Sequence, residues 1–510
     1  MDKSSSGRGT QRLYRAVRRL DSPLVPGPDS PPPLLIADVQ RTVEAELDRI
    51  GSVIDELGQR FAAAGESLAL VGGPVRDAML GRLQNDLDFT TSAHPDVTEK
   101  LLTGWADAIW DLGRAFGTIG AKKGEWQIEI TTFRSETYDP SSRKPEVNYG
   151  DSLSGDLGRR DFTVNAMAVT VSGSDRHLED PYGGLVDLAQ RVLRTPGAPE
   201  MSFGDDPLRM MRAARFAAQL GFTVAPEVVA AMRDMAGRIE IISAERVRDE
   251  LIKLMCAPYP RRGLQLLVET GLAQHVLPEL PALALERDEH HRHKDVYEHT
   301  LIVVEQAIAL ESRLDPPGPD FVSRFAALMH DVGKPKTRRL LPDGSVTFHH
   351  HDVVGAKLTR KRMQALRFSN EQTDAVAKLV ELHLRFHGYG EGEWTDSAVR
   401  RYVRDAGDQL ARLHILTRAD CTTRNQRKAD RLRRTYDELE ARIDRLSQEE
   451  EMAAIRPDLD GNQIMEILGI PPGRAVGEAY KFLLDQRLDR GPMSRDDAEA
   501  ALREWWAARA

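Results

Sequence analysis

The stretch that decides the fold runs from residue 68 to residue 91 and reads LALVGGPVRDAMLGRLQNDLDFTT. Its start, Leu68–Val71, is apolar and predicts a short strand, which ends at Gly72 and Gly73 where a helix begins. Two glycines at such a turn let backbone N–H groups approach phosphate oxygens, and the helix N-terminus favours an anion. Arg76 adds a guanidinium fork for phosphate. The turn therefore predicts a nucleotide-binding site that includes Gly72, Gly73 and Arg76.

The end of the same stretch carries a pair of carboxylates. In a strand, alternation places Asp86 and Asp88 on one face and Leu87 and Phe89 on the other. Like charges this close repel each other, and a cation relieves the repulsion. Such a pair can bridge two divalent ions about 3.5–4 Å apart, the arrangement used for in-line nucleotidyl transfer. An isolated Asp-x-Asp is equally compatible with a solvated strand face, so the preceding glycine turn is what favours a magnesium site.

A third acidic residue lies on another predicted strand. The segment 127–133 alternates in the same way, and Glu129 points opposite Ile128 and Ile130. If this strand neighbours the first, Glu129 completes the metal-binding set.

Composition limits the class of protein. The chain has 510 residues, 41% hydrophobic and 29% charged, with a net charge of −9, so we expect about two to four soluble globular domains. Its two cysteines, Cys256 and Cys421, exclude a disulfide scaffold and fit a reducing compartment. The apolar runs are far shorter than the roughly 18 residues of a membrane span. No apolar segment follows the basic N-terminus, so we expect no signal peptide, no membrane partner and a cytoplasmic protein.

Six motifs in order give a resemblance to a known family. After GGPVRD (72–77) and DLD (86–88) come EITTFR (129–134), RRDFTVNAM (159–167), DPYGG (180–184) and DDPLRMMRAARF (205–216). Over about 65–285 the chain resembles class II tRNA nucleotidyltransferases, the CCA-adding enzymes, and the related bacterial poly(A) polymerases. The resemblance implies an α+β fold in which a polymerase-β-like head precedes a mostly helical neck and body. It also implies template-independent addition of C, C and A to tRNA 3′ ends from CTP and ATP.

The resemblance assigns roles to the acidic residues. It implies that Asp86 and Asp88 hold Mg²⁺ as catalytic carboxylates. Glu129 is our choice for the third catalytic carboxylate, from the alternation of its strand. Asp161, in the RRDFT motif, is the competing choice for the third carboxylate and is also a candidate nucleotide-binding residue.

A polymerase without a template must read the incoming base with side chains. Cytosine and adenine both present an amino donor beside a ring-nitrogen acceptor, whereas uracil and guanine present the reverse. An Asp accepts only and an Arg donates only, so an Asp–Arg pair fits C and A. Asp206 and Arg209, three apart in a predicted helix starting at 205, are therefore expected on one face as the base-reading pair. The family has Glu where this chain has Asp205, whose role stays open, and a helix-terminal ion pair is the alternative.

Further polar residues are weaker candidates for nucleotide contacts. The arginines are expected to reach the triphosphate or the tRNA end, and the asparagine to hydrogen-bond the sugar: Arg159, Arg160, Arg212, Arg215 and Asn165. The polar stretch 135–156 corresponds to a mobile loop that helps the switch from C to A in CCA-adding relatives; a tolerated surface loop is the alternative.

A second cluster lies in the C-terminal half. The order His299, His330-Asp331 and Asp420 resembles the H…HD…D pattern of HD phosphohydrolases, which bind a divalent metal. Imidazoles and carboxylates favour Ni²⁺, Co²⁺ or Mn²⁺ over Mg²⁺ and can orient a water for phosphate hydrolysis. His351 and His383 could serve a second ion. A relic fold with a vacant site is the alternative.

These patterns predict five segments. They are a basic, Pro-rich tail (1–35), a nucleotidyltransferase head (36–195), a helical neck and body (196–285), an HD domain (286–435) and a helical tail (436–510). The leading interpretation is a CCA-adding enzyme, monomeric or homodimeric, acting on the tRNA 3′ end with ATP and CTP. A poly(A) polymerase, or an HD phosphohydrolase with an RNA-binding head, remains an alternative.

Overall fold

The computed structural model describes residues 32–114, 117–137, 146–149, 152–284, 296–389, 394–422, 426–450 and 456–509. It divides into two compact units, Met1–Val276 and Leu277–Ala510. Most of the predicted N-terminal tail and part of the predicted mobile loop lie outside the described residues.

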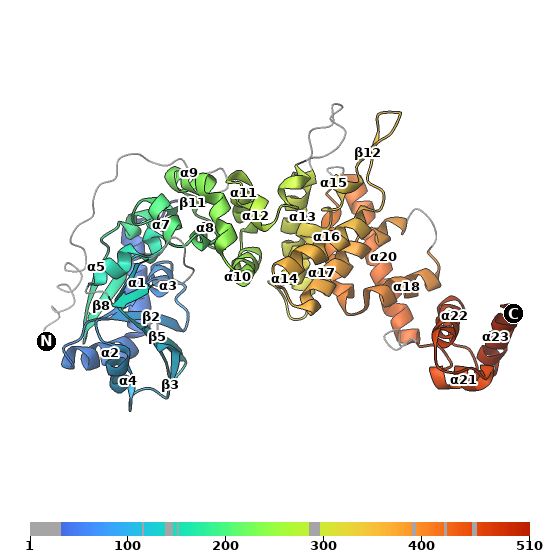
Figure 1. Ribbon diagram of the computed structural model, residues 1–510, viewed down its shortest axis with the longest axis horizontal. Coiled ribbons are helices and arrows are strands. Elements are labelled where there is room, and N and C mark those ends of the chain that lie inside the picture. The colour runs from blue at the N-terminus through green and yellow to red at the C-terminus, as the bar shows by residue number, and fades with distance from the viewer. Residues whose placement is uncertain are drawn as a thin grey trace, which may run out of the picture. The chain divides into compact units, whose positions relative to one another are not determined.

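Unit 1 is built on a seven-stranded mixed sheet with the order β3-β4-β5-β2-β1-β8-β9 (Figure 1). Only β2 and β5 are parallel neighbours in this sheet; the other pairs are antiparallel. The strands are β1 (Leu68–Val71), β2 (Asp86–Thr91), β3 (Ala108–Gly113), β4 (Thr118–Lys123), β5 (Trp126–Thr132), β8 (Ala168–Ser172) and β9 (Asp175–Glu179). The first two match the predicted strands, and β5 is displaced from its predicted bounds by one residue.

Helices of unit 1 cover this sheet and continue beyond it. They are α1 (Ile36–Arg49), α2 (Gly51–Ala63), α3 (Gly73–Met79), α4 (Pro95–Leu102), α5 (Leu153–Gly158), α6 (Gly184–Gln190), α7 (Pro199–Asp205), α8 (Leu208–Leu220), α9 (Pro226–Met235), α10 (Ala244–Met255), α11 (Pro260–Glu269) and α12 (Ala273–Val276). Two short pairs accompany them: β6 (Arg134–Thr137) with β7 (Glu146–Tyr149), and β10 (Val192–Leu193) with β11 (Thr223–Val224).

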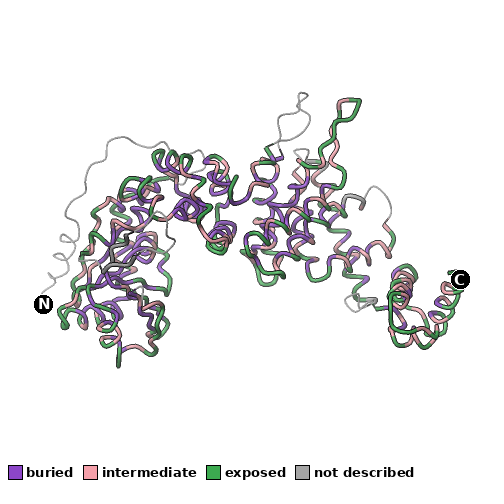
Figure 2. Tube along the Cα trace, in the orientation of Figure 1, coloured by how far each residue is buried: buried purple, intermediate pink, exposed green. Residues whose placement is uncertain are grey.

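The sheet has a core on each face at β1. All four residues of β1 are buried, and Figure 2 shows that much of the trace inside this part of unit 1 is purple. On one face, Ala69 and Val71 pack against Leu157 of α5 and Ala166. Because Ala69 pairs in register with Thr90, this is also the face that carries Asp86 and Asp88. The segment from α5 to residue 166 therefore packs over the carboxylate-bearing face.

Unit 2 is almost wholly helical. Its helices are α13 (Val296–Leu310), α14 (Phe321–Met329), α15 (Lys334–Thr337), α16 (His351–Ala365), α17 (Asn370–Leu382), α18 (Asp396–Ala406), α19 (Leu410–Asp420), α20 (Gln426–Glu450), α21 (Gly461–Leu468), α22 (Arg474–Arg490) and α23 (Arg495–Ala507). One small hairpin, β12 (Arg339–Leu340) and β13 (Val346–Thr347), separates α15 from α16. A mixed sheet with helices, followed by a mostly helical remainder, confirms the predicted fold class. Within the described residues, no helix is both long and apolar enough to cross a membrane.

Candidate active site and metal centre

The register of β2 and β5 brings the predicted carboxylates together. Asp88 pairs directly with Glu129, and Asp86 with Gln127, in the parallel ladder. Residues paired in register point to the same face of a sheet, so Asp86, Asp88 and Glu129 form one group. All three are exposed, whereas Leu87 and Phe89 between them are buried. The alternation predicted from the sequence is therefore observed, and the neighbouring strand is the one that carries Glu129.

The electrostatics of this group favour a bound cation. Partial desolvation by the surrounding protein, the nearby Glu129 charge and Asp86 raise the pKa of Asp88 to about 6, against opposing effects of Arg160 and Arg76. Clustered carboxylates of this kind fit Mg²⁺, which prefers oxygen ligands. The donor set therefore suits the metal that the sequence predicts, and one edge of the group is bordered by two arginines.

The glycine turn holds one of these arginines close to the backbone. Gly72 precedes α3 with φ of 72°, and a Cβ at this position would lie 2.6 Å from the Arg160 guanidinium. The positive φ favours glycine, and a Cβ would in addition displace the Arg160 guanidinium. Arg160 and Arg159 pair with the buried carboxylate of Asp156, at 3.3 and 2.5 Å. The Nε of Arg160 is buried and has no hydrogen-bond partner in the described part of the chain, while the side chain as a whole is partly exposed.

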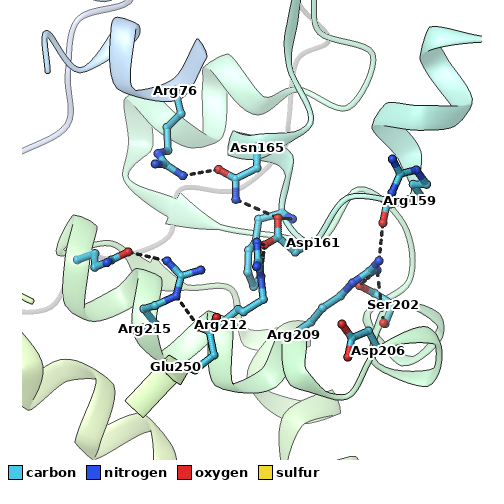
Figure 3. A network of polar contacts seen from close by, with 12 residues as sticks. Arg76, Arg159, Asp161, Asn165, Ser202, Asp206, Arg209, Arg212, Arg215 and Glu250 are labelled. Carbon is cyan, nitrogen blue, oxygen red and sulfur yellow. Dashed lines mark hydrogen bonds and ion pairs between the residues drawn. The ribbon is translucent and has the colours of Figure 1, made fainter. Parts of the chain in front are cut away.

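A buried polar network links the turn to α8 (Figure 3). Arg76 donates to the Asn165 amide oxygen at 2.6 Å, and the Asn165 amide nitrogen donates to Asp161 at 2.9 Å. Arg212 Nε donates to the other Asp161 oxygen at 2.7 Å. Burial alone would raise the pKa of Asp161, but the Arg212 charge and the Asn165 hydrogen bond outweigh it and lower the pKa to about 2. Asp161 and Asn165 are thus committed to protein partners.

Phe216 organises the arginines of this network, and we did not predict it from the sequence. The guanidinium carbons of Arg76, Arg212 and Arg215 lie 5.2, 5.6 and 4.0 Å from its ring centroid. Arg215 is also buried and pairs with Glu250 of α10. The sequence feature that could have indicated this role is the position of Phe216, one turn beyond Arg212 on a helix rich in arginine. Arg212 and Arg215 therefore have intramolecular partners, and the nucleotide contacts expected for them stay predictions.

The predicted base-reading pair lies at a break between two helices. The sequence predicts one helix through 205–209, but α7 ends at Asp205 and α8 begins at Leu208, because Asp206 is extended (φ −138°, ψ 100°). Its carboxylate accepts from Leu208 N at 3.1 Å and from Arg246 at 2.9 Å. Proline at 207 explains the break, since the residue before a proline avoids helical geometry.

Arg209 is held by a separate set of contacts. Its guanidinium donates to Ser202 Oγ at 2.9 Å and to the Arg159 carbonyl at 2.5 Å (Figure 3). Asp206 and Arg209 therefore lie on consecutive segments. Arg209 N donates to the Asp206 carbonyl at 3.0 Å, whereas the two side chains are held by other groups. Ser202 and Arg246 are supporting residues that we did not predict: Arg246 is 40 residues from Asp206 in the chain, and Ser202 meets Arg209 only because of the break between α7 and α8.

The predicted HD ligands of unit 2 form two adjacent triads. Ligand atoms of each triad lie within 4.8 Å of one another, and the two triads are His299, His330 and Asp420, and Asp331, His351 and His383. Asp331 joins them, because its two oxygens lie 3.2 Å from His330 Nε2 and 3.3 Å from His351 Nε2. All six predicted residues are therefore together, and each triad offers three possible ligands to an ion.

The far side of each imidazole is fixed by a hydrogen bond. The Nδ1 atoms of His330, His351 and His383 lie 2.8, 2.8 and 2.6 Å from carbonyl oxygens three residues earlier. A carbonyl only accepts, so these Nδ1 atoms carry the proton and the Nε2 lone pairs face the centre. The three Nε2 atoms are buried without hydrogen-bond partners in the described structure. His299 differs, since its Nδ1 contacts Thr422 Oγ1 at 3.0 Å.

Charge at the centre also suits a metal. Burial would raise the pKa of Asp331, but the charges of the neighbouring His330 and Lys334 outweigh it and hold the pKa well below its usual range. Burial and His330 lower the pKa of His383 to about 4. An ionised carboxylate beside a neutral imidazole is the state in which both groups bind metal.

Comparison with known proteins agrees with both sites. Family models match residues 68–194 (Poly A polymerase head domain), 221–283 (Probable RNA and SrmB-binding site of polymerase A) and 296–425 (HD domain). The A-adding tRNA nucleotidyltransferase of Deinococcus radiodurans is 35% identical over 86% of this chain and 95% of its own length. The CCA-adding enzyme of Levilactobacillus brevis is 42% identical over 42% of this chain and 53% of its own.

A solved structure extends the likeness to the whole fold. The Bacillus stearothermophilus CCA-adding enzyme in complex with CTP aligns with 91% of this chain and 98% of its own, with a TM-score of 0.61 and 25% identity. A nucleotidyltransferase head joined to an HD domain is the class that fold and site define. The chain belongs to the tRNA nucleotidyltransferase family that contains the A-adding and CCA-adding enzymes.

Proposed function

We propose that this chain completes tRNA 3′ ends by adding C, C and A from CTP and ATP without a template. The observation that carries the proposal is the register of Asp88 with Glu129 beside Asp86, at the end of a glycine turn bordered by Arg76 and Arg160. Magnesium held by these carboxylates would neutralise the triphosphate and activate the 3′ hydroxyl for in-line attack.

The residues around the carboxylates bind the phosphates, read the base and position other side chains. Arg160, whose side chain is partly exposed, binds phosphate oxygens together with the backbone N–H of Gly73. The N–H of Gly72 already donates to the Met167 carbonyl. Asp206 and Arg209 read the pairing edge of C or A and leave U or G with unmatched buried groups. Asp161, Asn165 and Arg212 keep Arg76 and α8 in place.

Addition of the final A alone is a second candidate. It is favoured by the relative that aligns over almost its full length, which is named an A-adding enzyme. Purified protein with Mg²⁺ and each nucleotide, tested on tRNA lacking CCA and on tRNA ending in CC, separates the two. Extension of both substrates supports CCA addition; extension of the CC-ending tRNA only supports A addition, and long A tails contradict both.

For the HD centre we propose metal-dependent hydrolysis of phosphate esters, including 3′-phosphates or 2′,3′-cyclic phosphates at damaged RNA ends. Three unpaired buried Nε2 atoms beside two carboxylates support it. The proposed ions are Ni²⁺, Co²⁺ or Mn²⁺, because imidazole ligands favour these over Mg²⁺. Elemental analysis together with hydrolysis assays over these ions is the test. The cytoplasmic location and a monomeric or dimeric state stay predictions.

A further inference from the structure

A small exposed hairpin rises from unit 2 directly beside the HD centre. We name residues 336–348 the HD hairpin; it contains β12 and β13, paired at Arg339 with Thr347 and at Leu340 with Val346. Figure 1 shows it projecting from the helices around it, and most of its trace is green in Figure 2. Its tip is well formed: Leu341 N donates to Ser345 O at 2.8 Å, and Asp343 accepts from Ser345 N at 2.9 Å.

Both ends of the HD hairpin connect to metal ligands. Two residues before its start, Lys334 Nζ lies 2.6 Å from Asp331 Oδ2, the carboxylate that joins the two triads. At its end, the Phe348 carbonyl accepts from His351 Nδ1 at 2.8 Å. Lys334 also lies 5.7 Å from the Phe348 ring centroid, which ties the two ends together. A molecule bound along the hairpin would therefore reach the HD centre.

The HD hairpin presents positive charge that the protein does not neutralise. Lys336, Arg338 and Arg339 are exposed, and no carboxylate of the described residues pairs with them. Asp343 is occupied by the turn at the tip. Leu340, between the cations and the tip, is 73% exposed. Elsewhere on the surface of unit 2, exposed arginines such as Arg474 and Arg503 have carboxylate partners one turn away.

We propose that the HD hairpin binds the phosphate backbone of a single-stranded RNA end and leads its terminal phosphate to the HD centre. Three unpaired cations in a short segment fit consecutive phosphates, and an exposed leucine can lie against an unstacked base. The HD hairpin would deliver RNA for the hydrolysis proposed above for the HD centre, and this inference rests on that proposed function. Water oxygen attacks phosphorus, the bond to the 3′ oxygen breaks, and that oxygen takes a proton, leaving a 3′ hydroxyl and inorganic phosphate.

The first test measures binding and does not depend on hydrolysis. Wild type is compared with the triple variant Lys336→Gln, Arg338→Gln, Arg339→Gln by fluorescence anisotropy on a short single-stranded RNA. We expect affinity at low salt to fall by roughly tenfold or more, and the slope of log affinity against log salt to fall by about 2. The charge-preserving variant Lys336→Arg, Arg338→Lys, Arg339→Lys should bind as wild type does. Equal affinity and slope in wild type and the neutral variant would overturn the proposal.

The second test separates delivery from chemistry. With RNA ending in a 3′-phosphate, the neutral variant should show a raised KM, whereas hydrolysis of a mononucleotide 3′-phosphate should not change. Equal loss on both substrates would contradict delivery by the hairpin. If wild type hydrolyses neither, the proposed hydrolase fails while the binding result still decides the hairpin's role. Binding of wild type, but not the neutral variant, to anionic phospholipid vesicles and not to RNA would assign the surface to a membrane instead.

Discussion

A carboxylate can hold a metal only if its oxygens are not already committed to the protein. Glu129 is exposed, pairs in register with Asp88, and accepts no hydrogen bond from a described residue. Asp161 is buried and accepts from Asn165, Arg212 and its neighbouring backbone N–H. Their surroundings therefore favour Glu129 as the third metal ligand and Asp161 as the group that positions two arginines.

This difference predicts distinct variant phenotypes. Asp86→Asn or Asp88→Asn should nearly abolish nucleotide addition, and Glu129→Gln should slow it on the order of 10–100-fold, all with little change in stability. Asp161→Asn should instead lower the free energy of unfolding by about 2 kcal/mol, because Arg212 loses its counter-charge. Primer extension over a Mg²⁺ series and denaturant unfolding measure the two effects. Unchanged Mg²⁺ dependence in Glu129→Gln would remove it from the metal site.

The pH dependence should report on Asp88. Its pKa of about 6 in the metal-free protein lies above its ordinary value, so protons compete with Mg²⁺ as the pH falls through 6. The Mg²⁺ concentration for half-maximal addition should rise about tenfold per pH unit below that point and level off above pH 7. Rates measured over a Mg²⁺ series at several pH values test this. A Mg²⁺ requirement that is constant from pH 5 to 8 would contradict it.

Base selection should depend on the Asp206–Arg209 pair. Asp206→Ala or Arg209→Ala leaves the remaining partner without its complement, so CTP and ATP addition should slow while discrimination against UTP and GTP relaxes by tenfold or more. Arg233→Ala is a matched control, because Arg233 is an exposed arginine of unit 1 paired with Glu269. Single-nucleotide incorporation with all four nucleotides gives the ratios. Wild-type ratios in both variants would place base reading elsewhere.

At the scale of single elements, the strand-to-helix turn is the most constrained part of the site. Gly72 has positive φ and lies beneath Arg160, whereas a Cβ on Gly73 would meet only an Arg76 nitrogen at 3.8 Å. Gly72→Ala should therefore cost about 1–2 kcal/mol or more and displace Arg160. Gly73→Ala, its control, should be close to wild type in stability.

Thermal unfolding of the Gly72→Ala and Gly73→Ala variants measures the change in stability. The KM for nucleotide measures the effect of displacing Arg160. Equal behaviour of the two variants would show that the close approach of Arg160 does not matter.

The sequence predicted those parts of the fold and site that depend on residues close together in the chain. Alternation around Asp88 and Glu129 placed both strands to within a residue, because that pattern is local. The helix through 205–209 was wrong at Asp206, where Pro207 breaks it, although proline within that stretch was a visible signal. Phe216 and Thr422 acquire their roles only through contacts between distant segments, which a single sequence does not contain.

At the scale of the whole molecule, the two candidate sites lie in two separately packed units. We assign nucleotide addition to carboxylates on a sheet and the proposed hydrolysis to imidazoles and carboxylates on helices. We therefore expect the double variant His330→Ala, Asp331→Ala to lose bound transition metal and any phosphatase or 2′,3′-cyclic phosphodiesterase activity. Addition of C, C and A should persist within about twofold of wild type. Loss of addition in a variant that remains folded would show that the two centres are coupled.

The most direct test of the central claim is the mass of the product formed on tRNA that lacks its CCA end. The protein is given Mg²⁺ with CTP and ATP together until the reaction stops, and the added nucleotides are identified by mass spectrometry. The account predicts growth by C, C and A in that order, with no further addition and none in the Asp88→Asn variant. A product extended by A residues only, or addition that survives Asp88→Asn, would contradict it.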